Sequence, residues 1–198
     1  MGSHSIVTLG RSRLIVSALL LLSLGASTPV LASNESMPKQ LQLGQTDLTL
    51  LGKGTATYLW FDVYDAALYA PENIKPAQIL SQETPRVLVL KYHHAVTVKD
   101  IEKASWQTLD KQLTPSERQS IKPQVDALQS SMKNVSPGDQ YTLTWQPENA
   151  QKKPELTLKL NDKIVFKSDN ARLAATYFGI WLGKPPLSQS LKRSLLGG

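Results

Sequence analysis

Cysteine is absent from the 198-residue sequence. This absence excludes disulfides, thiolate metal sites and a cysteine nucleophile, and it excludes attachment of a lipid to cysteine. Histidine is also scarce, because only His93 and His94 remain beyond residue 32. Adjacent residues on a strand point to opposite faces, so this pair cannot chelate one metal ion. We therefore expect no metal and no cofactor.

Recognisable catalytic motifs are missing as well. The sequence has no Gly-x-Ser-x-Gly elbow, and Gly52-Lys53-Gly54 is too short for a phosphate-binding loop. Ser130-Ser131-Met132-Lys133 matches Ser-x-x-Lys, but the companion motifs of that site are lacking. We assign no catalytic residue from these patterns.

No strong excess of charge marks the chain. Its 22 basic and 16 acidic residues give a net charge of +6, which falls to +4 without Arg11 and Arg13 of the first 32 residues. The lysines are spread along the sequence and interleaved with acids, whereas nucleic-acid binding proteins gather them on one face. Nucleic acid is therefore not an expected partner.

The one long apolar run lies near the N-terminus, at Leu14–Ala26. It is shorter than the roughly 20 residues that a membrane-spanning helix needs. Arg11 and Arg13 precede the run, and Val30-Leu31-Ala32 follows it, which is the order of a secretory signal peptide. We predict a signal peptide at residues 1–32, cleavage near Ala32, and a single domain at 33–198 that does not stay inserted in a membrane.

Two groups of strands are predicted in that domain. Residues 33–43 are expected to be loose, 46–51 to form a strand, and Gly52-Lys53-Gly54 to turn the chain. Aromatic and β-branched residues make 55–69 either two strands or one long bent strand. Further strands are predicted at 86–93, 141–145, 156–160 and 164–166.

Four helices are predicted between and after the strands. Thr97 and Thr114 are expected N-caps of two consecutive helices, the second of which Pro123 should disturb. Asn170 begins a third helix, and residues 188–196 form a short fourth. Strands joined by hairpins, with helices grouped together, predict an α+β fold with helices on one face of a twisted antiparallel sheet.

Three blocks of sequence share a family resemblance. They are Gly52–Ala56 (GKGTA) with Phe61–Pro71 (FDVYDAALYAP), Gly138–Trp145 (GDQYTLTW), and Ala174–Pro186 with the following Leu191–Leu196. In this order and spacing they resemble the chalcone isomerase-like proteins of bacteria, from about residue 48 to the C-terminus.

The resemblance implies an open-faced β-sandwich, in which a large antiparallel sheet and a layer of helices enclose a mostly apolar pocket. Relatives in plants include the isomerase that closes a chalcone ring and proteins that hold fatty acids. Both use an arginine just after the glycine segment, where this chain has Ala56. The chain thus resembles an exported member that lacks the usual arginine, with Lys53 as the nearest replacement cation.

Aromatic residues are plentiful in the predicted strands and in the helices expected to cover them. A pocket between the two layers would be lined by these rings, with tyrosine hydroxyls at its polar end. The candidate ligand-binding residues are Lys53, Tyr64, Tyr69, Lys91, Tyr92, Tyr177 and Trp181.

Three functions are compatible with this pattern. The favoured one is a non-catalytic binding protein that holds a fatty acid or similar amphiphile, and the resemblance to bacterial proteins places it in the periplasm. The second is an isomerase (intramolecular lyase) acting on a small molecule, which needs a general acid or base in the pocket. The third is a structural or protein-interacting domain whose cavity is filled by side chains such as Trp60 and Trp181.

Overall fold

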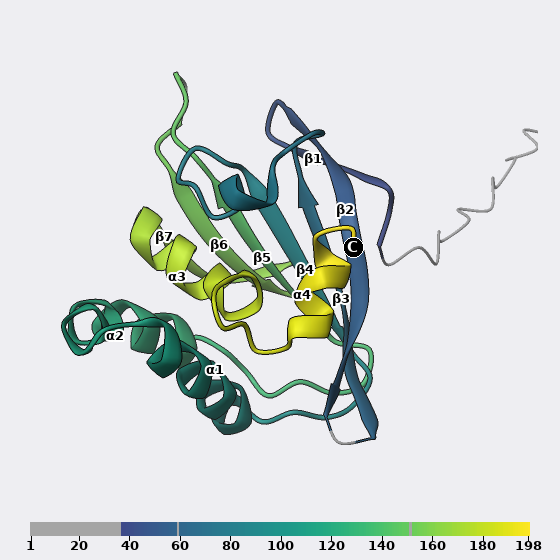
Figure 1. Cartoon of the computed structure of the whole chain (residues 1–198), viewed down its shortest axis with the longest axis vertical. Helices are drawn as coiled ribbons and strands as arrows, with labels where there is room; N and C mark the ends of the chain where they lie inside the picture. The colour runs from purple at the N-terminus through teal and green to yellow at the C-terminus, as the bar shows by residue number, and fades with distance from the viewer. Residues whose placement is uncertain (1–36, 59, 151) are drawn as a thin grey trace, which may run out of the picture. The chain divides into compact units, whose positions relative to one another are not determined.

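Seven antiparallel strands lie side by side in the order in which they occur in the sequence (Figure 1). The computed structural model describes residues 37–58, 60–150 and 152–198, all within the unit Asn34–Gly198. The predicted signal peptide lies outside the described residues. The strands are β1 (Gln40–Leu43), β2 (Thr46–Tyr58), β3 (Phe61–Ala70), β4 (Arg86–Tyr92), β5 (Gln140–Gln146), β6 (Glu155–Leu160) and β7 (Lys163–Ser168).

The helices form two pairs. Helices α1 (Val98–Gln112) and α2 (Pro115–Ser130) connect β4 to β5, and α3 (Ala171–Leu182) and α4 (Gln189–Leu195) follow β7. A short 3₁₀ turn, η1 (Pro76–Gln78), lies between β3 and β4. In the described part of the chain, no helix is both long and apolar enough to cross a membrane. The arrangement confirms the α+β prediction.

The helices begin where the sequence predicts. The Thr97 hydroxyl accepts from the Asp100 backbone N–H, and Asn170 caps α3 through the N–H of Leu173. Thr114 and Glu117 form a reciprocal capping box at the start of α2. Pro123 lies inside α2 and does not end it, since the helix continues to Ser130.

All four helices pack on one side of the sheet, which we call the inner face (Figure 1). Alternate residues of each strand point to this face, where they join the side chains of α3 and α4 in the main core. On β3 these residues are Tyr64, Ala66, Leu68 and Ala70, and on β5 they are Tyr141, Leu143 and Trp145. The opposite, outer face has a smaller cluster of Leu48, Ala67, Tyr69, Val87 and Val89.

The glycines of Gly52-Lys53-Gly54 do not turn the chain, contrary to the prediction. Strand β2 runs through them without a break, and the turn into β3 comes only after Tyr58. Their small size is needed because α4 packs directly on this part of β2. A Cβ atom on Gly52 would lie 2.0 Å from the backbone oxygen of Ser194, and one on Gly54 would lie 2.8 Å from the Ser194 Cβ. Residues 55–69 accordingly form parts of two strands.

The prediction that residues 33–43 are loose was also wrong where the structure describes them. Gln40–Leu43 form β1, which pairs with β2 across a turn at Gly44. Gly44 has a φ of +61°, a backbone conformation that glycine adopts without steric cost. Leu41 and Leu43 pack against the outer-face cluster, and this apolar contact orders the segment.

Candidate functional site

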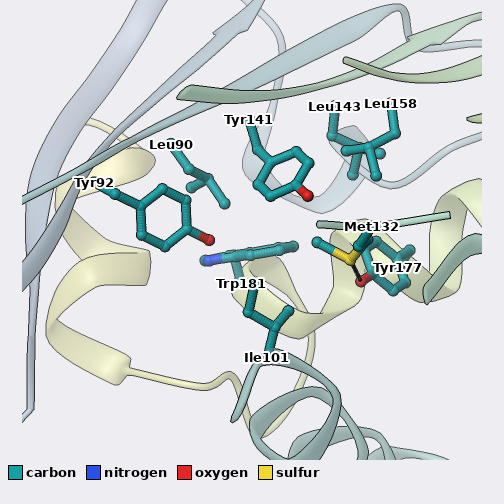
Figure 2. A pocket seen from close by; sticks show the side chains of 9 residues that line it. All are labelled: Leu90, Tyr92, Ile101, Met132, Tyr141, Leu143, Leu158, Tyr177 and Trp181. Carbon is teal, nitrogen blue, oxygen red and sulfur yellow. Dashed lines mark hydrogen bonds between the residues drawn. The ribbon is translucent and has the colours of Figure 1, made fainter. Parts of the chain in front are cut away.

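A cavity lies between the inner face of the sheet and the helices (Figure 2). Its volume is about 20 Å³, which is room for about one water molecule. Strands β4, β5 and β6 supply one wall, and α1, α3 and the segment after α2 supply the other. The lining residues are Leu90, Tyr92, Ile101, Met132, Tyr141, Leu143, Leu158, Tyr177 and Trp181.

The alternation of each strand explains why these side chains meet. Leu90 and Tyr92 are two residues apart on β4, and Leu143 faces Leu158 across the β5–β6 ladder. On α3, Tyr177 and Trp181 are four residues apart, so both lie on the helix side that faces the sheet. Figure 2 shows the Trp181 indole between the strand side chains and Ile101 of α1.

Hydrogen bonds hold the polar ends of four aromatic residues in and beside the cavity. The Trp181 indole N–H donates to the Tyr64 hydroxyl over 2.9 Å. The Tyr141 hydroxyl accepts from the Lys133 backbone N–H at 2.7 Å and donates to its carbonyl at 2.9 Å. The Tyr177 hydroxyl contacts the Met132 sulfur at 3.4 Å. These bonds orient the rings around the cavity.

The Tyr92 hydroxyl points toward Trp181 and forms no hydrogen bond with any described residue (Figure 2). Its ring packs between those of Tyr64 and Tyr141, with centroid distances of 5.4 and 6.2 Å. These distances are typical of favourable tilted and edge-to-face contacts. Tyr92 is therefore a rigidly held donor at one end of an apolar cavity.

Burial keeps the tyrosines of this region protonated. It raises the pKa of Tyr64 to about 12, although the hydrogen bond from Trp181 acts in the opposite direction. Burial also raises the pKa values of Tyr177 and Tyr92 well above the ordinary value for tyrosine. A phenol with such a pKa donates a hydrogen bond at neutral pH but does not accept a proton. The site can orient a polar head group, and its described lining contains no carboxylate, imidazole or amine.

The structure brings together four of the predicted binding residues. Tyr92, Tyr177 and Trp181 line the cavity, and Tyr64 lies behind Trp181 as its hydrogen-bond acceptor. Ala56 pairs with Tyr64 across β2 and β3 and packs against the main core. Position 56 therefore lies on the inner face, next to the polar end of the cavity.

The other three predicted residues lie on the outer face of the sheet. Lys53 pairs with Ala67, and Lys91 pairs with Asp65, so both point away from the cavity. Tyr69 packs in the outer-face cluster, where its hydroxyl is buried and has no partner in the part of the chain that the structure describes. These three do not contact the cavity because the strand backbone separates the two faces.

Six lining residues were not predicted. They are Leu90, Ile101, Met132, Tyr141, Leu143 and Leu158. A signal was available for those on strands, because Tyr141, Leu143 and Trp145 alternate with polar residues and so share one buried face. Ile101 and Met132 could not be found in this way, because their place depends on how α1 and α2 pack against α3.

The two histidines lie outside the cavity. Nε2 of His93 is 3.0 Å from an Asp65 carboxylate oxygen on the outer face, and His94 packs edge-on against Phe61. Burial would raise the pKa of Asp65, but hydrogen bonds from Thr55 and His93 outweigh it and lower the pKa. Across residues 37–58, 60–150 and 152–198, no group of histidine and acidic side chains could hold a metal ion.

Comparison with known proteins identifies the fold. No curated protein matches the sequence. Among solved structures, the fatty-acid binding protein AtFAP1 of Arabidopsis thaliana matches with a TM-score of 0.58 and 14% identity, over 81% of this chain and 91% of that one. At this identity the match supports the fold alone. A model of the family described as chalcone isomerase-like matches residues 32–197. Since this match spans the whole sheet, all four helices and the cavity between them, the chain belongs to the chalcone isomerase-like family.

Proposed function

We propose that this protein is an exported, non-catalytic binding protein that holds a fatty acid or similar amphiphile between the sheet and the helices. The observation that carries the proposal is the cavity itself, which combines aliphatic and aromatic walls with a Tyr92 hydroxyl that has no hydrogen-bond partner among the described residues. Ligand sites are mostly apolar with a few placed polar groups that fix orientation. The plant neighbour, which is a fatty-acid binding protein, supports the same ligand class.

Binding an acyl chain requires the layers to part, since the cavity of about 20 Å³ holds only about one water molecule. Helices α1 and α2 pack mainly against α3 and against each other, so they can shift without disrupting the strand ladders. Met132, just after α2, is unbranched and adapts its shape readily. In this proposal the ligand enters by moving these elements, and the sheet remains fixed.

Export follows from the proposed signal peptide at residues 1–32, which has a basic start, a short apolar run and a small residue before the cut. The periplasm is the proposed location, because the sequence blocks resemble those of bacterial proteins. An amphiphile of low solubility needs a carrier in an aqueous compartment, which agrees with a binding role there.

The test is titration with dodecanoate of protein expressed from the complete sequence, followed by native mass spectrometry. We expect one acyl chain per molecule in the parent protein. Leu158→Phe should abolish this binding, because the larger ring fills the space of the cavity. Ile164→Phe on β7 is the matched control, since Ile164 is 51% exposed. A protein that neither copurifies with an acyl chain nor binds added dodecanoate would refute the proposal.

A second candidate is a domain that works through its surface, with the cavity filled by its own side chains. The small cavity volume favours it, and so do three aromatic residues at the β2–β3 turn. Tyr58, Trp60 and Phe61 are 71%, 85% and 59% exposed, which is unusual for large apolar side chains. Absence of dodecanoate binding in the titration above would make this candidate the better one.

A further inference from the structure

Arg86 is the only charged residue with a buried side chain in the described part of the chain. It is the first residue of β4, it has 0% exposure, and it pairs with Trp145, so it lies on the inner face. Loop residues 81–84 adjoin it, because the indole N–H of Trp145 donates to the Gln82 carbonyl at 2.8 Å. A guanidinium is thus enclosed in the layer between sheet and helices.

Only part of this guanidinium has hydrogen-bond partners. Nη1 donates to the carbonyls of Ser81 and Thr84, each at 2.8 Å. Nε and Nη2 are buried, and within residues 37–58, 60–150 and 152–198 they have no acceptor. The Phe178 ring lies 4.7 Å from Cζ and contributes a cation–π contact. Such a contact is weaker than the cost of burying an ion without a counter-charge.

No carboxylate of the described residues neutralises this charge. The four ion pairs found among the described residues involve other groups. Burial lowers the pKa of Arg86 to about 10, which is still far above neutrality, so the side chain is a cation under ordinary conditions. An unpaired arginine fork has the geometry to receive a carboxylate by two parallel hydrogen bonds.

Arg86 lies on the same face of β4 as residues that line the cavity. Arg86, Leu88 and Leu90 are alternate residues of β4 and share the inner face, and Leu90 lines the cavity. Four residues of strand separate Arg86 from Leu90, a distance of about 13 Å. Leu88 lies between them on the same face and is fully buried. The polar groups at the other end of the cavity are the uncharged phenols and the indole.

We propose that Arg86, rather than the Tyr92 hydroxyl, is the head-group residue of the ligand site and binds a carboxylate. The acyl chain then extends along the inner face of β4, and its far end lies beside the Tyr92 ring. This inference rests on the proposed amphiphile-binding function and adds its orientation and head-group chemistry. The carboxylate accepts hydrogen bonds from Nε and Nη2 of Arg86. The carbonyls of Ser81 and Thr84 accept from Nη1 and so hold the guanidinium in place. The site therefore selects fatty acids over uncharged amphiphiles of the same length.

The test compares dodecanoate with dodecan-1-ol at neutral pH, using protein expressed from the complete sequence. We expect the acid to bind roughly tenfold to hundredfold more tightly, as for a hydrogen bond between charged groups. Arg86→Met should remove this preference while the alcohol still binds. Lys91→Met is the matched control, because Lys91 lies on the same strand but on the outer face, and it should keep the preference.

A second measurement needs no substitution and remains valid if Arg86→Met fails to fold. Dodecanoate labelled with carbon-13 at its carboxyl group is bound to the parent protein and titrated by NMR. Beside Arg86 the carboxyl should stay ionised below the pH at which the free acid is half protonated. Equal affinity for acid and alcohol, or a bound carboxyl that titrates like the free acid, overturns the role of Arg86 and leaves the proposed function standing. Binding of neither compound overturns both.

Discussion

The indole N–H of Trp181 on α3 donates to the hydroxyl of Tyr64 on β3 over 2.9 Å, across the buried layer between helix and sheet. The two residues are 117 positions apart in the sequence. Trp181 also lines the cavity, so this bond determines how the indole faces any occupant. Stability and the shape of the site therefore depend on the same pair of side chains.

Removing the hydroxyl of Tyr64 should destabilise the protein. Tyr64→Phe leaves the Trp181 N–H buried without an acceptor, which costs about 1–3 kcal/mol of the free energy of unfolding. Urea denaturation measures the change. Tyr58→Phe removes the same group from a side chain that is 71% exposed, so it should change stability by less than about 0.5 kcal/mol. Equal effects of the two substitutions would contradict the role of the bond.

Alkaline pH should weaken the fold through the buried tyrosines. The pKa of Tyr64 is about 12 in the folded protein and 10 is its ordinary value. Above pH 10 the unfolded chain therefore loses the proton first, and stability falls as the pH rises toward 12. The contribution of Tyr64 is complete below pH 10 and amounts to about 2–3 kcal/mol. Urea denaturation gives the free energy of unfolding of the parent and of Tyr64→Phe at each pH. The difference between these two free energies should become smaller from pH 10 to pH 12. A constant difference would show that Tyr64 does not titrate in this way.

Gly52→Ala should displace α4 from the sheet. The added Cβ would meet the Ser194 backbone oxygen at 2.0 Å, and backbone cannot move aside as a side-chain tip does. We expect a loss of about 3 kcal/mol, measured by thermal or urea unfolding. Gly179→Ala on α3 is the control, because its nearest neighbour is the flexible Gln112 side chain at 3.2 Å. Its effect should stay within about 1 kcal/mol, since alanine also favours the helix.

Enlarging the cavity should destabilise the protein and make its melting temperature rise more when dodecanoate binds. Leu143→Ala removes a buried side chain from the lining and should cost about 2–5 kcal/mol in the absence of ligand. Dodecanoate should raise the melting temperature of this variant more than that of the parent, because the acyl chain fills the enlarged space. Leu187→Ala, at a site that is 39% exposed, should show neither effect. An unchanged ligand response in Leu143→Ala would argue that the acyl chain does not occupy this cavity.

Local signals in the sequence identify the helices well. Thr97, Thr114 and Asn170 each cap a helix in the structure as predicted, because capping depends on residues only three positions apart. The strand at residues 40–43 was missed, since its order comes from apolar contacts with the outer-face cluster. The role of Gly52 could not be found either, because the helix that requires it lies far downstream.

The candidate site was predicted in part, and the errors have a simple physical origin. Adjacent residues such as Lys91 and Tyr92 must point to opposite faces of a strand, and so must Tyr64 and Tyr69, which are five positions apart. Counting alternation along β3 and β4 would have separated the cavity residues from the outer-face ones. Arg86 was not singled out, because its burial follows from the loop at 81–84 and from Phe178 of α3.

The contact between α4 and β2 also bears on how a nascent chain acquires this fold. Strands β1 to β4 can pair locally as soon as they emerge in the compartment where the chain folds, but the inner surface of β2 stays uncovered until residues near Ser194 have emerged as well. Contacts between such distant segments form late in folding. The inner face of the first hairpins is therefore the surface that a chaperone would shield, and it is also where premature aggregation would begin.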